Sequence, residues 1–281
     1  MGTFLVRSYS VESVTRFLAD FGGNRVVRIV NQTRKFFGQS FGALLNILSK
    51  STPPLVRQSL AYCPTALLRM LAIAYLSVSE VLPPDPELVA LTPLVGPGST
   101  IVEVGSNIGS GTLVLAKLVG SKGLVIAFEP NPIAFAVLKE NLRCYTNVRV
   151  YGRGVGLTVG EATLSMASGF ADKSATLVGT RRKGSIAVRV NVVTLDEVVS
   201  NLGREVDLFV IDAEGAEFQI ILGGANVIRH SQKARVVIEF HPLLAPKSVE
   251  KTRELLSRWG FNKSWVLAES PSTSTRIFIK N

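Results

Sequence analysis

Two acidic residues flank a glycine-rich segment near the middle of the chain. Glu103 precedes the segment Gly105-Ser106-Asn107-Ile108-Gly109, and Glu129 follows Gly109 by 20 positions, at the end of an apolar run. Glycines let the backbone approach a ligand closely, and a helix after them offers free N–H groups. A carboxylate at the end of the next strand can accept both hydroxyls of a ribose. The sequence therefore predicts a nucleotide-type cofactor site, formed by Glu103, Gly105, Ser106, Asn107, Gly109, Glu129, Pro130, Asn131 and Asp212.

The charge of this segment indicates which cofactor it binds. A pyrophosphate-binding loop follows the pattern G-x-G-x-x-G, but here the second glycine is replaced by Asn107. Glu103 would also repel phosphate groups at this turn. S-adenosylmethionine carries a sulfonium and an ammonium group, which an acidic turn attracts. We therefore predict S-adenosylmethionine, with an oxidoreductase that uses a nucleotide cofactor as the alternative.

Three further residues are candidates for catalysis. Asp212 ends an apolar strand pattern, His241 follows the next one, and Glu214 lies two residues after Asp212. Ligands of open α/β sheets bind at the carboxyl ends of the strands. Methyl transfer to a hydroxyl needs alignment of the reactants and removal of a proton, so Asp212 or His241 could act as the general base. Glu217 is interpreted as a helix-capping residue and His230 as a structural residue near a helix end.

The same region raises the question of a metal. Asp212, Glu214, Glu239 and His241 would form an oxygen-rich magnesium site if the two strand ends are neighbours. Their spacing is not diagnostic, since acids are common at strand ends in cofactor clefts. The sequence therefore predicts no metal ligands.

An alternation of strands and helices has to position these residues. Continuous apolar runs that suggest buried strands occupy 100–104, 124–128, 148–151, 206–212 and 234–240, and helical patterns occupy 110–118, 132–144, 216–228 and 248–258. Continuous apolar strands joined by helices indicate a parallel sheet covered on both faces. The last two strands, 263–268 and 275–280, are joined by so short a connection that they must form an antiparallel hairpin. This layout is typical of class I methyltransferases, an α/β doubly wound fold.

Two other regions differ from this pattern. Residues 1–85 read as a helical N-terminal extension or cap, and residues 86–281 as the cofactor-binding domain. Within that domain, 157–193 reads as an inserted hairpin with a basic tip, because 161–167 and 186–193 alternate like half-buried strands.

Charge and cysteine content bear on location and partners. The formal net charge is +10, and residues 1–80 contain nine Lys or Arg against three Asp or Glu. We expect the segment 1–80 either to pack as a cap on the cofactor-binding domain or to lie on an anionic membrane surface, and we prefer the cap. Cys63 and Cys144 have no metal or redox spacing, so we expect both to be buried and reduced, in a cytoplasmic protein. A non-catalytic basic module that binds membrane or RNA is a further alternative.

From residue 99 onward the chain resembles the FkbM-type methyltransferases. Five blocks carry the resemblance, in the family's order: 103–109, 128–132, Thr194-Leu195-Asp196-Glu197, Asp212-Ala213-Glu214-Gly215-Ala216-Glu217 with 222–225 behind it, and 237–241. The resemblance implies methyl transfer from S-adenosylmethionine, typically to a hydroxyl of a sugar, a glycan or glycolipid, or a secondary metabolite. It implies a small-molecule or glycan acceptor rather than nucleic acid. The chain has Val210 where this family often has Lys.

Overall fold

The computed structural model describes residues 91–166, 176–177 and 186–280. The predicted N-terminal extension, its possible membrane contact, Cys63 and the tip of the hairpin insertion lie outside these residues. Within them, no helix combines the length and the hydrophobicity that crossing a bilayer requires.

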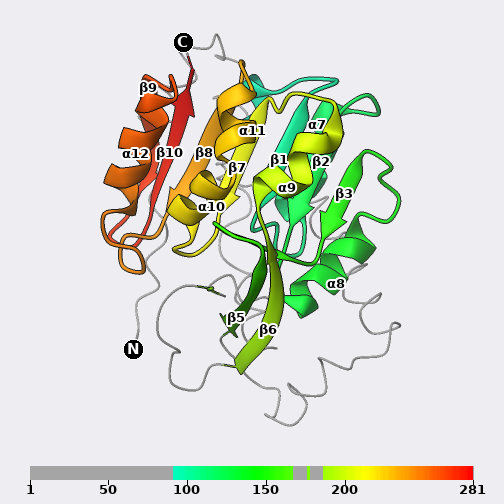
Figure 1. The fold of residues 1–281 in the computed structure, drawn as a ribbon. Coiled ribbons are helices and arrows are strands. Elements are labelled where there is room, and N and C mark those ends of the chain that lie inside the picture. Colours follow the sequence, from blue (N-terminus) through cyan, green and yellow to red (C-terminus); the bar gives the residue numbers. More distant parts are fainter. Residues whose placement is uncertain (1–90, 167–175, 178–185, 281) are drawn as a thin grey trace, which may run out of the picture.

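A sheet of seven strands forms the centre of the fold (Figure 1). Its order is β3-β2-β1-β7-β8-β10-β9. The first five strands are parallel, and β10 runs antiparallel to both β8 and β9. The bounds are β1 Thr100–Val104, β2 Leu124–Phe128, β3 Val148–Tyr151, β7 Leu208–Asp212, β8 Arg235–Phe240, β9 Lys263–Glu269 and β10 Ser274–Ile279. The parallel sheet that ends in an antiparallel hairpin is therefore confirmed.

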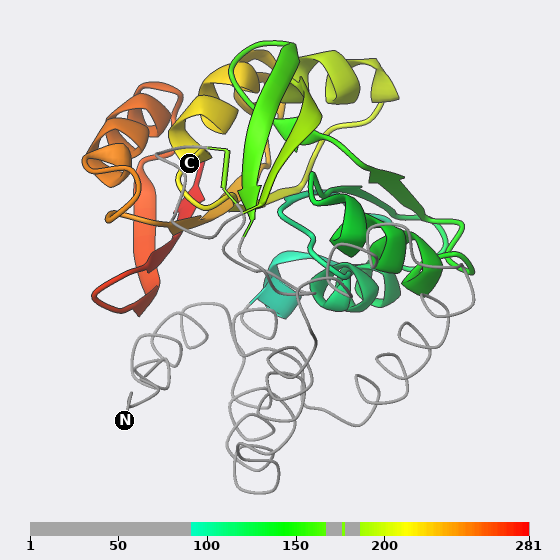
Figure 2. The same ribbon diagram turned by 90° about the horizontal axis from the view of Figure 1, so that it is seen from below.

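Helices cover both faces of this sheet (Figure 2). Because side chains alternate along a strand, neighbours such as Ile101 and Val102 in β1 belong to different core clusters. One face packs against α7 (Ser110–Val119), with α8 (Pro132–Asn141) beside it. The other face packs against α9 Leu195–Val199, α10 Glu217–Gly223, α11 Ala225–His230 and α12 Ser248–Arg258. Two 3-10 helices, η1 Thr92–Leu94 and η2 Ser200–Leu202, complete the helical elements among the described residues.

A smaller sheet of three strands, in the order β4-β6-β5, contains the predicted hairpin. The strands β5 (Gly160–Met166) and β6 (Ile186–Val193) pair antiparallel, as expected for an inserted hairpin. The short strand β4 (Gly154–Val155) pairs parallel with β6 and was not predicted, because two residues give no periodicity.

Two expectations were wrong. The helix predicted over 216–228 is two helices, α10 and α11, which meet at Gly224. A side chain at Gly224 would lie 2.9 Å from Leu195, so this junction packs closely on α9. Cys144 is exposed rather than buried, because α8 ends at Asn141 and leaves it in the following turn.

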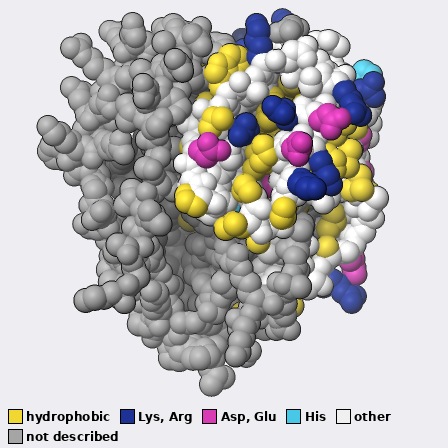
Figure 3. All heavy atoms as spheres, turned by 90° about the vertical axis from the view of Figure 1, so that its left-hand side faces the viewer, with side chains coloured by type: hydrophobic (Ala, Val, Ile, Leu, Met, Phe, Trp, Pro, Cys, Tyr) yellow, Lys and Arg dark blue, Asp and Glu magenta, His cyan; other side chains and the backbone are white. Residues whose placement is uncertain are grey.

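The surface beside α12 and β9 carries both signs of charge (Figure 3). Arg258 pairs with Glu254 and Arg276 pairs with Glu269 in this region. The basic excess of the sequence does not form a single-sign surface on this face, which gives no support there to a nucleic-acid-binding module.

Candidate active site

Glu129 lies directly after β2 and is buried. Its two carboxylate oxygens accept backbone N–H groups from opposite sides, Oε2 from Asn107 at 2.8 Å and Oε1 from Asn131 at 2.7 Å. Burial raises the pKa of Glu129 to about 7, which the two hydrogen bonds oppose and the nearby charge of Glu103 reinforces. Each oxygen has a second lone pair, so this carboxylate can still accept hydroxyl groups from a ligand.

Glu103 is buried at the end of β1 and is bonded within the protein. Its Oε2 accepts the hydroxyl of Ser106 at 3.0 Å and that of Thr112 in α7. Burial raises the pKa of Glu103, and these two hydrogen bonds oppose the effect. Glu103 thus ties the glycine-rich segment to α7. Thr112 was not identified from the sequence; a hydroxyl in the first turn of α7 was its only signal.

The two glycines of the segment have left-handed backbones, with φ of 90° at Gly105 and 92° at Gly109. A Cβ on Gly105 would lie 1.8 Å from the carbonyl oxygen of Asp212, and one on Gly109 would lie 2.7 Å from the side chain of Leu138. The sequence suggested that glycine is needed here for approach to a ligand. The structure gives a second reason, which is that the protein's own backbone and helix α8 leave no room for a side chain.

The other predicted cofactor residues lie around Glu129. Asn131 is buried and caps α8, because its side chain accepts the backbone N–H groups of Ile133 and Ala134. Asn107 has a left-handed backbone, with φ of 48°, and its side chain accepts the N–H of Ile108. Pro130 is half-buried between Glu129 and Asn131.

A second group of side chains surrounds His241, which follows β8 and is buried. Its Nε2 lies 3.7 Å from Asp212 Oδ1, 3.5 Å from Glu214 Oε1 and 3.9 Å from Glu239 Oε1. The parallel pairing of β7 with β8 places Asp212 opposite Glu239 and accounts for this convergence. The predicted catalytic residues Asp212, Glu214 and His241 are therefore close together.

Glu217 orients the ring of His241. Its Oε1 lies 2.8 Å from Nδ1 and also accepts the backbone N–H of Gly215 at 2.9 Å. The sequence suggested a cap, and the bond to Gly215 has that character, but the contact with His241 was missed. The residues are 24 positions apart, so only the folded sheet brings them together.

The charge of His241 depends on its neighbours. Burial lowers the pKa of this imidazole, but the hydrogen bond to Glu217 and the charges of Glu214, Asp212 and Glu217 outweigh burial and raise it to about 9. Glu214 has a left-handed backbone, with φ of 48°, where a non-glycine residue is uncommon. Its backbone oxygen accepts the hydroxyl of Thr176 at 2.6 Å.

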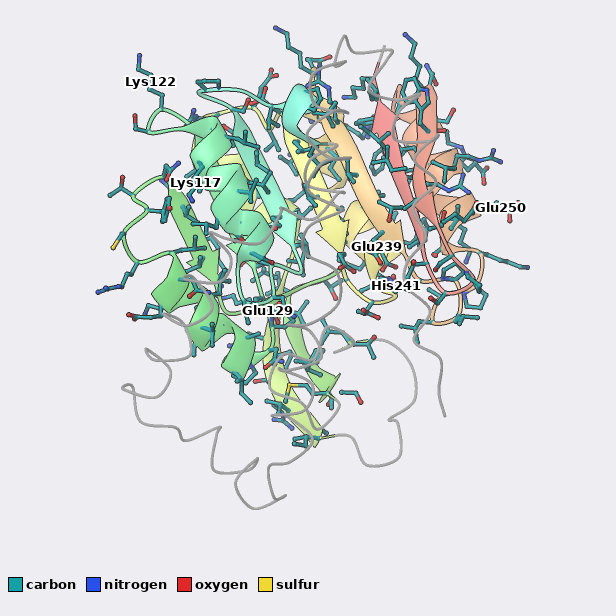
Figure 4. All side chains as sticks on the ribbon, turned by 180° about the vertical axis from the view of Figure 1, so that it is seen from behind. Lys117, Lys122, Glu129, Glu239, His241 and Glu250 are labelled. Carbon is teal, nitrogen blue, oxygen red and sulfur yellow. The ribbon has the colours of Figure 1, made fainter. Side chains whose placement is uncertain are left out.

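The two groups adjoin one another at the carboxyl edge of the parallel strands. Gly105 lies against the backbone of Asp212, which joins the glycine-rich segment to the residues around His241. In Figure 4, Glu129, Glu239 and His241 lie toward the same edge of the sheet, whereas Lys117 and Lys122 lie toward the other end. A ligand held by Glu129 would therefore have Asp212 and His241 nearby.

Comparison with known proteins identifies the family. The model of the methyltransferase FkbM domain matches residues 103–263, which include both groups. The chain belongs to the FkbM methyltransferase family. The family resemblance read from the five sequence blocks is thus confirmed, and S-adenosylmethionine is the cofactor. This finding decides against the alternative of an oxidoreductase cofactor.

A curated relative is the hexuronic acid methyltransferase AglP of Haloferax volcanii. It is 29% identical over 153 residues, which are 53% of this chain and 59% of AglP. The match thus spans less than two thirds of the relative's length.

Among solved structures, the chain is similar to a putative rRNA methylase from Clostridium thermocellum, with a TM-score of 0.43 and 15% identity over 69% of this chain and 94% of that one. It is also similar to an S-adenosylmethionine-dependent O-methyltransferase from Thermotoga maritima, with a TM-score of 0.43 and 14% identity over 69% of this chain and 65% of that one.

Val210, where the family often has Lys, lies in the middle of β7 and packs partly against the core cluster that includes Leu208 and Val237. The side chain therefore contributes to the core on the face of the sheet that α7 covers.

Proposed function

We propose that the protein transfers a methyl group from S-adenosylmethionine to a hydroxyl oxygen of a sugar or glycan. Family membership supports the methyl transfer, and the name of AglP supports a sugar acid as the class of acceptor. The observation that carries the proposal is the contact between Gly105 and Asp212, because it joins a ribose-binding carboxylate region to a group of potential proton acceptors.

In this proposal Glu129 accepts the ribose hydroxyls of the cofactor. The cofactor supplies a sulfonium-bound methyl group, and the left-handed backbone of Gly105 leads into Asn107, whose N–H donates to Glu129. Glu103 holds the glycine-rich segment by accepting the hydroxyl of Ser106, and the backbone N–H of Asn131 donates to Glu129. In this proposal Glu103 positions the loop and Asn131 positions Glu129.

Asp212 is the proposed general base. Its side chain is 44% exposed, whereas those of Glu214 and His241 are 17% and 7% exposed, so an acceptor reaches Asp212 first. As the acceptor oxygen forms its bond to the methyl carbon, the bond from that carbon to sulfur breaks. The hydroxyl proton passes to Asp212, and the products are a methyl ether and S-adenosylhomocysteine. His241 Nε2 lies 3.7 Å from Asp212 Oδ1, beside this carboxylate.

The test uses the full chain with a methyl donor labelled with carbon-13 and a set of neutral sugars, hexuronic acids and their glycans. Mass spectrometry should find the label in a sugar product, and Asp212→Asn should lower the rate at least about a hundredfold, within the range for loss of a general base. Glu250→Gln, an exposed change in α12, is the control.

The position of the label separates the outcomes. A hexuronic acid has both hydroxyl and carboxyl oxygens, and a methyl ether resists alkaline hydrolysis that removes a methyl ester. A label lost to alkali would refute transfer to a hydroxyl. A chain that binds S-adenosylmethionine but labels no sugar would refute the sugar as acceptor.

A further inference from the structure

The imidazole of His241 directs one nitrogen at three carboxylates, two of them at the end of β7 and one in β8. A carboxylate only accepts hydrogen bonds, so Nδ1 donates its proton to Glu217 and fixes the orientation of the ring. Nε2 then faces Asp212, Glu214 and Glu239 at 3.5 to 3.9 Å. The part of the chain that the structure describes gives Nε2 no hydrogen bond, although this side chain is only 7% exposed.

These separations approach those of ligands around one ion. The ligating atoms of Asp212, Glu214 and His241 all lie within 4.8 Å of one another. Atoms that are bound to one cation at about 2.0 to 2.2 Å lie roughly 3 to 3.5 Å apart, so the distances from Nε2 to Asp212 and Glu214 nearly fit already, and the widest pair would have to close by roughly 1 to 2 Å. Asp212 Oδ1 is buried, and the exposure of this side chain therefore belongs to its remaining atoms.

The contact with Glu217 is a second and independent indication. Histidines that bind metals almost always donate their other ring N–H to a carboxylate or a carbonyl, which sets the tautomer. Glu217 makes this contact from a fully buried position, and its Oε2 has no hydrogen-bond partner among the described residues. A buried carboxylate oxygen of this kind is stabilised by a cation nearby.

We propose that Asp212, Glu214 and His241 bind a divalent transition-metal ion at the carboxyl ends of β7 and β8, with Glu239 beside the site and Glu217 as the residue that orients His241. One imidazole with several carboxylates suits Mn²⁺ or Zn²⁺ better than Mg²⁺, which prefers oxygen ligands alone. This differs from the sequence-based prediction of no metal ligands. A cation there would polarise an acceptor hydroxyl, while the exposed oxygen of Asp212 takes its proton.

The test measures binding of Mn²⁺ to the full chain, purified with a chelator, in the absence of methyl donor and acceptor. Electron paramagnetic resonance should find one bound Mn²⁺ per chain. His241→Ala and Asp212→Asn should each weaken binding by roughly tenfold or more, and Mg²⁺ should compete poorly. His230→Ala is the matched control, because this exposed histidine hydrogen-bonds to the backbone oxygen of Asn226 within its own helix, α11.

Circular dichroism establishes whether each variant is folded. If His241→Ala unfolds, the test relies on Asp212→Asn, which keeps the shape of a partly exposed side chain. The proposal is wrong if the wild type shows no saturable binding of Mn²⁺ or Zn²⁺. It is also wrong if folded Asp212→Asn binds as tightly as the wild type, or if Mg²⁺ binds as tightly as Mn²⁺. Because no acceptor is involved, these results are independent of whether a sugar is methylated.

Discussion

Binding of S-adenosylmethionine should weaken as the pH falls below neutrality, because Glu129 then gains a proton. Burial raises the pKa of this carboxyl from its ordinary 4.5 to about 7 in the ligand-free protein. A protonated carboxyl has one oxygen occupied by hydrogen and can no longer accept both ribose hydroxyls alongside the N–H groups of Asn107 and Asn131. The binding-competent state is therefore the ionised one.

The pKa sets the size of the effect. With a pKa of about 7, the ionised fraction falls from about 76% at pH 7.5 to about 3% at pH 5.5. Because the apparent dissociation constant varies inversely with the competent fraction, it should rise about 25-fold across this interval. The folded-state pKa of Glu129 lies above its unfolded value, so this group's contribution to the stability of the ligand-free protein falls as the pH rises from about 4.5 to about 7.

Isothermal titration calorimetry at pH 5.5, 6.5 and 7.5 would measure this dependence. Glu129→Gln cannot ionise, so its binding should be weaker by roughly tenfold to a hundredfold at pH 7.5, from the loss of a charged hydrogen-bond acceptor, and nearly independent of pH. Glu250→Gln should keep the wild-type slope. A dissociation constant that stays constant in the wild type, or a Glu129→Gln variant with the wild-type slope, would refute the reasoning.

Two further predictions concern stability, measured by urea unfolding. Gly105→Ala should lower the free energy of unfolding by more than about 2 kcal/mol, because φ is 90° and the new Cβ would meet the carbonyl oxygen of Asp212. Gly160→Ala is the control, because its Cβ would meet nothing within 4 Å. Asp196→Ala should lower the free energy of unfolding by about 1 kcal/mol, because this carboxylate accepts the first N–H groups of α11. The substitution of its neighbour, Glu197→Ala, should lower it little. Equal urea midpoints for these two variants would contradict the capping role.

Local patterns determined much of the fold. The bounds of β1, β2, β3, β6 and α12 agree with those read from the sequence, because continuous apolar runs and helical spacing are properties of short segments. The break at Gly224 could not be read in this way, since it results from packing against Leu195 rather than from a local signal.

The candidate site also has one part that the sequence predicted and one part that only the fold revealed. The residue types and spacing of Glu103, Gly105 and Glu129 indicated a cofactor site, because strand, turn and carboxylate lie within one βαβ unit and their order fixes their arrangement. The contact of Glu217 with His241 required the pairing of β7 with β8, which brings together residues 24 positions apart. Only the tertiary structure decided that several carboxylates surround the imidazole of His241, because long-range strand pairing leaves no periodic pattern in the sequence.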